Sequence, residues 1–468
     1  MINWQNIQIK IRTSVLLNNV DLKLKNGASL GIIGANSCGK TILAKAIAGL
    51  LPIHGKNQSE NYSSIYVSFQ SDFQLKHGAR GYRQQRWNWT DPEYIPTVQE
   101  EFDSIENQME LQKLIHQFNF ENHLNRFVIS LSNGEQRKFE LIKALSGKPD
   151  VLVIDNAFNG LDKSSRTLLH EMLNQLIIQG HSLVLTGLNL KDFPEKLMKF
   201  IIIDKEKKCS ALHRSELPEI YTSIPFNENK LQNWKNSSDT EIIHLNKLYL
   251  KMGEKTILKN ISWTIQAGEC WVLSGANGSG KTSLLNMIFA DNPKAYQCDI
   301  RLFGKQKGSG ESIWDIKNRI GFVSPEMHQY LPGKQKVNDV ICSGFFVSEG
   351  LYQQPTSFQR NLAAQWLNFI GLKHLNEVPF GTLSASAQRM VLILRSLVKN
   401  PPLILLDEPF QGLDPNNIER MKTVLKNIAQ NTNCAMIFVS HYSDEIPEGF
   451  NLELRLNSGE IEYIGKIN

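Results

Sequence analysis

The chain has 468 residues, of which 41% are hydrophobic and 21% are charged, a composition typical of globular proteins that fold in water. Its formal net charge of +5 is too small to indicate, by itself, binding to nucleic acid or to an anionic lipid surface. No apolar run approaches the roughly 20 residues that span a bilayer, so any role at a membrane must come through a partner.

The length predicts two or three domains, each large enough to bury a hydrophobic core. Residues 1–5 contain neither a basic region nor an apolar stretch, so we expect no secretory signal. The cysteines show no spacing typical of a metal site or a disulfide framework, which favours a reducing, cytoplasmic compartment. They are Cys38, Cys209, Cys270, Cys298, Cys342 and Cys434.

Two β-like segments over residues 7–24 open the chain, followed by a predicted strand at 30–33 and a predicted helix at 41–50. Between this strand and helix, two glycines followed by Lys and Thr fit the P-loop pattern. In such a loop the backbone N–H groups face phosphates, the Lys reaches the β/γ-phosphates and the Thr holds Mg²⁺. We expect nucleotide contacts from Gly34, Ala35, Asn36, Ser37, Cys38, Gly39, Lys40 and Thr41.

A helix-rich middle follows the P-loop, and an apolar strand at 151–155 then ends in Asp155. This is the Walker B arrangement, in which the carboxylate reaches Mg²⁺ beside the P-loop. A further strand is predicted at 183–186, and the alternation of buried strands with helices predicts an α/β fold with a parallel sheet. Residues 218–240 lack clear periodicity, which predicts a linker between domains at 1–217 and 241–468.

The second domain repeats this order, with β-like segments at 242–265 and an acidic strand at 403–407. Glu408 follows the strand-ending Asp407, and such a Glu can polarise an attacking water as a general base. His441 follows a strand predicted at 435–440, where it is placed to contact the γ-phosphate. The second P-loop predicts nucleotide contacts from Gly275, Ala276, Asn277, Gly278, Ser279, Gly280, Lys281 and Thr282.

The order of P-loop, signature segment, Walker B strand, Leu-Asp loop and terminal His resembles the ATP-binding cassette (ABC) family over nearly the whole chain. The signature segments at 131–136 and 383–388 distinguish this family from other P-loop proteins. The resemblance implies two tandem P-loop NTPase domains that bind and hydrolyse ATP with Mg²⁺. Each would have a parallel core sheet, an antiparallel β subdomain and a helical subdomain.

The resemblance also implies that the two cassettes pair head to tail within the chain, so that each ATP lies between one P-loop and the opposite signature. The implied signature contacts are Ser132, Gly134, Gln136, Ser384 and Gln388. The implied Mg²⁺ ligands are Thr41, Gln70, Asp155, Thr282 and Asp407. The implied catalytic residues are Lys281, Glu408 and His441.

The two copies differ in their catalytic parts. Asn156 stands where the general-base Glu is expected, and we align Gly187 with the position of the His. Ser37 replaces a P-loop glycine, and Ser386 replaces a signature glycine in the second copy. All four changes fall on one composite site, which predicts one hydrolytic site and one nucleotide-holding site. Tolerated drift in a weakly active pair is the alternative.

The loop that carries Gln70 in the first copy departs from the pattern in the second copy, where we align Pro325 with Gln70. Proline has no side-chain acceptor, so Glu326 is the candidate substitute. Arginines and aromatic residues are interleaved at 77–89, between Gln70 and the helical middle. This insert is compatible with a protein-partner surface, a solvated loop or contacts to nucleic acid.

Three functions fit these patterns. The first is the ATPase subunit of an importer that drives a separate membrane permease, located peripherally on the inner face of the membrane. Within the family the fused pair is most similar to tandem cassettes of molybdate-transport operons, also called photorepair proteins, and this similarity alone suggests an oxyanion. The second is a tandem cassette acting on ribosomes or nucleic acid, and the third is a repair or regulatory ATPase.

Overall fold

The computed structural model describes residues 1–11, 14–35, 38–68, 96–131, 133–158, 161, 163–188, 190–204, 206–216, 238–252, 255–325, 327, 331–348 and 350–467. The chain divides into two compact units, Met1–Ile220 and Tyr221–Asn468, each with its own sheets and hydrophobic cores. The predicted linker at 218–240 lies largely outside the described residues.

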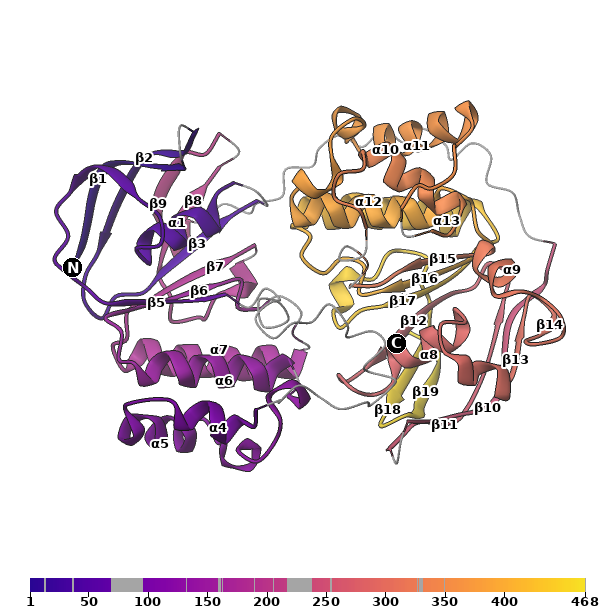
Figure 1. Cartoon of the computed structure of the whole chain (residues 1–468), viewed down its shortest axis with the longest axis horizontal. Helices are drawn as coiled ribbons and strands as arrows, with labels where there is room; N and C mark the ends of the chain where they lie inside the picture. Colours follow the sequence, from indigo (N-terminus) through magenta and orange to yellow (C-terminus); the bar gives the residue numbers. More distant parts are fainter. Residues whose placement is uncertain are drawn as a thin grey trace. The chain divides into compact units, whose positions relative to one another are not determined.

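Unit 1 contains two sheets, one helix beside the strands and a separate set of helices (Figure 1). The antiparallel sheet has the order β2-β1-β4, and the central sheet has the order β5-β6-β7-β3-β8-β9 with only β9 antiparallel. The strands are β1 (Ile2–Ile11), β2 (Ser14–Leu24), β3 (Leu30–Gly34), β4 (Ile53–Asn57), β5 (Ser64–Ser68), β6 (Val151–Asp155), β7 (Leu183–Gly187), β8 (Lys199–Ile203) and β9 (Cys209–His213). The helices are α1 (Lys40–Ile47), α4 (Val98–Asp103), α5 (Gln108–Gln117), α6 (Asn133–Ser146) and α7 (Lys163–Ile178).

Unit 2 repeats this arrangement. Its antiparallel sheet has the order β11-β10-β13-β14, and its central sheet has the order β15-β16-β17-β12-β18-β19. The strands are β10 (Glu241–Met252), β11 (Lys255–Gln266), β12 (Cys270–Gly275), β13 (Asp299–Leu302), β14 (Lys305–Gln306), β15 (Ile320–Val323), β16 (Leu403–Asp407), β17 (Ala435–Val439), β18 (Leu452–Asn457) and β19 (Glu460–Lys466). The helices are α8 (Lys281–Ile288), α9 (Ile313–Asn318), α10 (Val337–Cys342), α11 (Ser357–Phe369), α12 (Ala385–Leu397) and α13 (Pro415–Asn431).

The central strands are buried on both faces, as their uninterrupted apolar sequences predict. Every residue of β6 and of β16 is buried. Side chains alternate along a strand, so β6 sends Leu152 and Ile154 into one core of unit 1, and Val151 and Val153 into the other. This packing on two faces holds the carboxyl end of each acidic strand beside the neighbouring P-loop.

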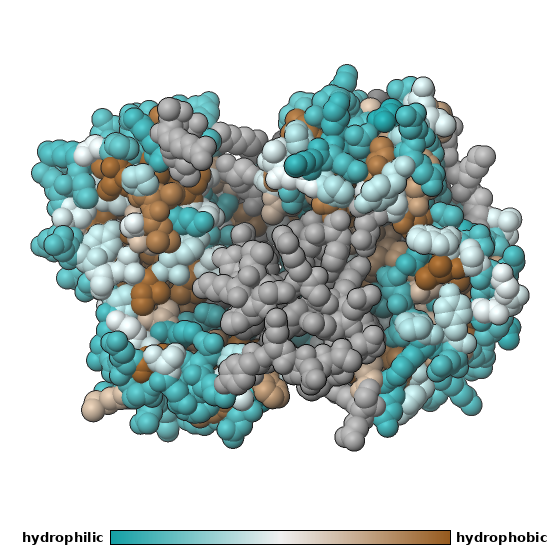
Figure 2. Space-filling model, viewed as in Figure 1, coloured by the Kyte–Doolittle hydropathy of each residue, from teal (hydrophilic) through white to brown (hydrophobic). Residues whose placement is uncertain are grey.

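Each unit therefore has the α/β fold expected of an ABC ATPase domain, with a mainly parallel core sheet, an antiparallel sheet and a set of helices. Figure 2 shows that the visible described surface of both units is mainly hydrophilic, with small groups of apolar residues. Across the described ranges, no helix combines the length and the apolar character that crossing a membrane requires.

Candidate nucleotide-binding and hydrolysis sites

Each P-loop turns into its helix through a glycine with left-handed backbone. Gly39 has φ of 114° and precedes α1, and Gly280 has φ of 105° and precedes α8. Side chains are strained in this region, whereas glycine adopts it freely. A Cβ atom would also lie 2.9 Å from Leu17 at Gly39 and 2.8 Å from Leu258 at Gly280. Both loops therefore require glycine at this position.

The P-loop lysines adopt the same conformation in the two units. Lys40 Nζ donates hydrogen bonds to the carbonyl oxygens of Gly34 and Ala35, at 2.9 and 2.7 Å. Lys281 Nζ donates to the carbonyl oxygens of Gly275 and Ala276, at 2.8 and 2.9 Å. Each ammonium thus lies within its own loop, where a phosphate oxygen can exchange for a carbonyl partner.

Each unit also brings a hydroxyl from the P-loop helix to the Walker B carboxylate. Thr41 Oγ1 donates to Asp155 Oδ2 at 2.8 Å, and Thr282 Oγ1 donates to Asp407 Oδ2 at 2.9 Å. Mg²⁺ prefers hard oxygen ligands such as hydroxyl, carboxylate and phosphate oxygens. The donor set in both units therefore fits the expected ion.

Unit 2 places a carboxylate and an imidazole together after the acidic strand, a pair that the described residues of unit 1 do not provide. Glu408 Oε1 lies 3.1 Å from His441 Nε2, and the His441 side chain is only 9% exposed. Glu408 has φ of 45°, a left-handed conformation that is uncommon for this residue type. Such strain is retained where surrounding structure over-determines it, which is frequent at functional sites.

The equivalent turn in unit 1 carries Asn156, with φ of 52°. Asparagine tolerates left-handed backbone better than most residues, because its side chain can bond locally. The backbone turn is therefore the same in both units, while the residue in unit 1 is the less strained one. Asn156 lacks the carboxylate that a general base needs.

The strand registers correct one predicted correspondence. Ile154 pairs with Leu185, so the β6–β7 register places Asp155 opposite Thr186. In unit 2, Asp407 pairs with Val439. Ile32 in β3 likewise pairs with Thr186, and the equivalent Leu273 in β12 pairs with Val439. The residue equivalent to His441 is therefore Leu188, whereas Gly187 corresponds to Ser440. Our alignment of Gly187 with the His was wrong by one residue because it matched Thr186 to Ser440, hydroxyl to hydroxyl.

A second register corrects the correspondence of Pro325. Ser68 of β5 pairs with Asp155, and Val323 of β15 pairs with Leu406, so Ser324 corresponds to Ser68. Counting two residues onward from Ser68 and from Ser324 makes Glu326, and not Pro325, the equivalent of Gln70. Gln70 and Glu326 themselves lie outside the described residues. An acidic oxygen donor thus replaces the amide at this sequence position.

The Walker B carboxylates have different surroundings. Asp155 accepts hydrogen bonds from Tyr66 Oη at 2.8 Å and from the Thr186 hydroxyl, in addition to Thr41. In unit 2 the equivalent positions are Phe322 and Val439, which have no hydroxyl. Sequence reasoning missed Tyr66 and Thr186, although a comparison of the two copies in the correct register would have found both.

The buried Asp407 carboxyl has a pKa raised to about 6, mainly by burial and then by the neighbouring Glu408 charge. The hydroxyl of Thr282 and the cations Lys281 and Arg389 act in the opposite direction. The charged form of Asp407 is therefore poorly compensated in unit 2 in the absence of a cation.

The signature segment of unit 2 begins helix α12. Ser384 is the N-cap, and its hydroxyl accepts from the backbone N–H of Ala387 at 3.2 Å. Gln388 Nε2 donates to the carbonyl oxygens of Phe380 and Leu383, at 3.1 and 3.3 Å. Ser384 and Gln388 thus have structural partners in this unit.

The signature glycine differs between the units together with its neighbour. A Cβ atom at Gly134 would lie 2.5 Å from the Ser165 hydroxyl, so unit 1 requires glycine there. In unit 2 the buried Ser386 accepts a hydrogen bond from Asn417 Nδ2 at 3.1 Å instead. Gln136 lies on α6, while Ser132 lies outside the described residues.

Arg389 connects the signature helix α12 to the segment at Ser324 and to the turn at Glu408. Its guanidinium donates to the carbonyl oxygen of Ser324 at 2.7 Å and to that of Glu408 at 3.0 Å. The side chain is almost wholly buried, which lowers its pKa to about 10. Motif comparison overlooked Arg389 because its partners are backbone atoms.

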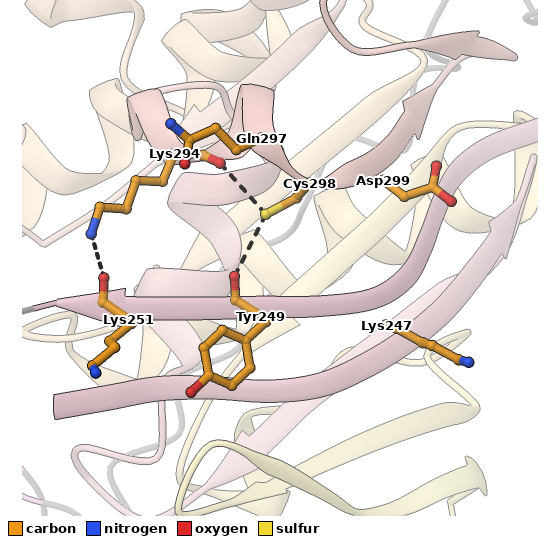
Figure 3. Close-up of a pocket in the computed structure, with 7 residues that line it drawn as sticks. All are labelled: Lys247, Tyr249, Lys251, Lys294, Gln297, Cys298 and Asp299. Carbon is orange, nitrogen blue, oxygen red and sulfur yellow. Dashed lines mark hydrogen bonds between the residues drawn. The ribbon is translucent and has the colours of Figure 1, made fainter. Parts of the chain in front are cut away.

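A hollow of about 400 Å³ lies on the outer face of the antiparallel sheet of unit 2 (Figure 3). Cys298 is hydrogen-bonded to the carbonyl oxygens of Tyr249 and Lys294, both at 3.5 Å. None of the lining residues belongs to the P-loop, signature or Walker B segments. They are Lys247, Tyr249, Lys251, Lys294, Gln297, Cys298 and Asp299.

Some predicted site residues fall where the structure gives no description. These are Asn36 and Ser37 of the first P-loop, Gln70, Ser132 and the insert at 77–89. The remaining P-loop and Walker B residues lie within their own units at the carboxyl ends of β3 and β6, or of β12 and β16. The described signature residues lie instead at the starts of α6 and α12.

The family model described as "ABC transporter" matches residues 17–159 and 258–411. The ABC transporter ATP-binding protein ModF of Escherichia coli (strain K12) is 34% identical over 452 residues, which cover 91% of this chain and 90% of that protein. An uncharacterized ABC transporter ATP-binding protein of Schizosaccharomyces pombe is 28% identical, with 95% of this chain and 96% of the relative covered.

A solved structure of the archaeal ribosome recycling factor, in complex with a ribosomal stalk protein, has a TM-score of 0.62 at 17% identity. The match covers 97% of this chain and 89% of that chain, and it shows likeness of fold. Since the family model matches twice and the Escherichia coli relative is 34% identical along most of both chains, this chain belongs to the ABC transporter family as a tandem ATP-binding protein.

Proposed function

We propose that this tandem ABC protein hydrolyses ATP with Mg²⁺ in unit 2 and retains nucleotide in unit 1. The observation that carries the proposal is the pair of Glu408 and His441, at 3.1 Å, with Glu408 held in left-handed backbone. Unit 1 keeps the same turn but has Asn156 and Leu188 at these positions. Unit 1 also keeps Lys40 and the Thr41–Asp155 hydrogen bond, which are the parts needed for binding.

Hydrolysis in unit 2 begins when Glu408 accepts a proton from water as the water oxygen bonds to the γ-phosphorus. The bond from this phosphorus to the β–γ bridging oxygen breaks, and ADP leaves. His441 holds the Glu408 carboxylate through Oε1, and Lys281 neutralises charge on the phosphate oxygens. Thr282 and Asp407 would hold Mg²⁺, which supplies additional charge neutralisation and alignment of the phosphates.

We also propose that the two cassettes pair head to tail, as the family resemblance implies. Lys281 and Glu408 would then share a nucleotide with Ser132, Gly134 and Gln136. Lys40 would share the other nucleotide with Ser384 and Gln388.

Coupling to a separate membrane permease is the biological role that we propose, with the chain peripheral on the cytoplasmic face. The support is the similarity to ModF, an ABC transporter ATP-binding protein, at 34% identity. Resemblance to molybdate-operon cassettes further suggests an oxyanion as the transported substrate. Action on ribosomes or nucleic acid, or in repair, is the competing role, and it depends on the insert at 77–89.

The test has two parts. Purified protein should hydrolyse ATP only with Mg²⁺, and after rapid desalting it should retain nucleotide at close to one site per chain. Affinity purification from solubilised membranes should recover an integral membrane protein in stoichiometric amount. The chain expressed without that partner should leave the membrane fraction in an alkaline wash. Recovery of ribosomes or nucleic acid in place of a membrane protein would replace the transport role with the competing one.

A further inference from the structure

The Walker B aspartates differ in how their buried charge is compensated. Asp155 is 1% exposed and Asp407 is 3% exposed, so neither carboxylate is solvated by bulk water. A buried charge without compensation is strongly unfavourable. In a protein of this family the compensation can come from a bound cation or from the protein itself.

In unit 1 the protein supplies this compensation. Tyr66 Oη donates to Asp155 Oδ2 at 2.8 Å, and the Thr186 hydroxyl donates to Asp155 Oδ1. These two hydroxyls reach the carboxylate from the strands on either side of β6, namely β5 and β7. Their dipoles point the positive hydrogen at each oxygen, so both carboxylate oxygens have a donor besides Thr41.

In unit 2 the same positions cannot donate. The strand pairings make Phe322 in β15 the equivalent of Tyr66 in β5. They make Val439 in β17 the equivalent of Thr186 in β7. Phe lacks only the hydroxyl of Tyr, and Val replaces the Thr hydroxyl by a methyl group. Among the described residues, Thr282 is the side chain that donates to Asp407.

ATP brings a highly negative triphosphate beside this carboxylate. Without a divalent cation, the repulsion is larger where the carboxylate has one hydroxyl donor, as at Asp407, than where three hydroxyl dipoles stabilise its charge, as at Asp155. A cation therefore gains more from binding next to Asp407 than next to Asp155. Since the cation and the triphosphate bind together, this difference appears in the affinity for nucleotide.

We propose that Tyr66 and Thr186 are positioning residues that make nucleotide binding in unit 1 much less dependent on Mg²⁺ than nucleotide binding in unit 2. The inference rests on the proposed function in one respect, that unit 1 binds nucleotide. It adds a distinct property: unit 1 keeps its nucleotide when free Mg²⁺ is withdrawn, whereas unit 2 releases it.

The experiment measures equilibrium binding of a fluorescent ATP analogue to the full chain, with saturating Mg²⁺ and with EDTA. Lys281→Ala isolates unit 1, and Lys40→Ala isolates unit 2. For each, the ratio of the Kd in EDTA to the Kd in Mg²⁺ is determined. We expect a ratio about tenfold smaller for unit 1, since one hydrogen bond to a charged group is worth roughly that factor.

Substitutions then assign the difference to the hydroxyls. In the Lys281→Ala background, Tyr66→Phe should raise the ratio about tenfold, and Thr186→Ser should leave it unchanged because the hydroxyl remains. Phe322→Tyr in the Lys40→Ala background should lower the ratio. Tyr62→Phe is the matched control, because Tyr62 Oη donates to the carbonyl oxygen of Ile47 at 2.7 Å and not to Asp155.

The outcomes separate the two proposals. No binding to unit 1 in Mg²⁺ would overturn the proposed function. Binding to both units with equal ratios, or a Tyr66→Phe variant whose ratio matches that of its parent, would overturn the present inference alone. A merely structural role of Tyr66 would weaken binding equally with Mg²⁺ and with EDTA, so the ratio separates that role from positioning even if the variant loses stability.

Discussion

Units 1 and 2 have closely similar backbone turns at the P-loop and after the Walker B strand, and they differ in the side chains around the Walker B aspartate. The P-loop glycines have φ of 114° and 105°, and the turns after the Walker B strands have φ of 52° and 45°. At that turn unit 1 has an asparagine and a carboxylate with three hydroxyl donors. Unit 2 has a strained glutamate beside a carboxylate with a raised pKa.

The difference indicates that the residues proposed for hydrolysis in unit 2 are less favourable for folding than the residues at the equivalent positions of unit 1. Unit 2 tolerates left-handed Glu408 and the poorly compensated Asp407, both of which are unfavourable for folding. Unit 1 has Asn156 at the turn and three hydroxyl donors to Asp155, both of which are more favourable for folding. This pattern is the expected trade-off between activity and stability at a functional site.

The largest effect should come from the P-loop lysines. Lys281→Ala should abolish ATP hydrolysis, because it removes the cation that neutralises the reacting phosphates of unit 2. Lys40→Ala should weaken nucleotide retention and reduce the rate only in part, since coupling between sites is typically worth about 1–3 kcal/mol. Steady-state ATPase assays with nucleotide occupancy after desalting make the comparison. Equal losses would favour symmetric sites, and a larger loss from Lys40→Ala would reverse the assignment.

The general base gives the next test. Glu408→Gln should lower turnover by about 10² or more while ATP binding persists, because the amide cannot accept the proton. Asn156→Gln is the matched control in unit 1 and should leave turnover almost unchanged. Turnover by Glu408→Gln near the wild-type rate would contradict the role of this residue.

The stability of the protein should depend on pH through the Asp407 carboxyl. The native pKa of Asp407 is raised to about 6 from an ordinary 3.8, so the native state binds this proton more tightly than the unfolded state. Its penalty is absent at low pH, grows as pH rises from about 4 to about 6, and is complete above that, at roughly 2–3 kcal/mol.

Asp407→Asn should therefore stabilise the nucleotide-free, metal-free protein at pH 7 and remove this part of the pH dependence. Asp155→Asn should be destabilising, because it weakens hydrogen bonds from Thr41, Tyr66 and Thr186 to a charged group. Denaturant unfolding in EDTA at several pH values measures both variants. Parallel pH profiles for wild type and Asp407→Asn would contradict the raised pKa of Asp407.

The smallest effect should come from backbone strain. Glu408→Asn places in unit 2 the residue found at the equivalent turn of unit 1, and it should stabilise the protein by about 1 kcal/mol as activity is lost. Glu408→Gln has the same loss of charge without the preference of Asn for left-handed backbone, so it serves as the control. A thermal midpoint of Glu408→Asn no higher than that of Glu408→Gln would show that strain is not relieved there.

Much of the fold was accessible from the sequence. Strands β6 and β16 begin and end where the apolar runs at 151–155 and 403–407 predict. The helix predicted at 41–50 also forms, over Lys40–Ile47, and a helix follows the second P-loop at Lys281–Ile288. Continuous apolar strands and glycine-rich turns carry strong local signals, which is why these elements are predictable.

The side-chain environment of the carboxylates was not accessible. Tyr66 and Thr186 come from two strands that flank Asp155, and their contact depends on the register across three strands. The errors at Gly187 and Pro325 have the same origin, because the sequence does not show which residues of neighbouring strands pair. The composition of each motif was readable, but its exact alignment between the copies required the pairing of the strands.

Arg389 gives unit 2 a mechanical property. The guanidinium is anchored on α12 and bonded to two backbone oxygens, one at Ser324 and one at Glu408. A displacement of α12 must either carry both loops with it or break two charge-assisted hydrogen bonds, each worth about 1.5–3 kcal/mol. A displacement of α12 would therefore be transmitted through Arg389 to the turn that bears Glu408.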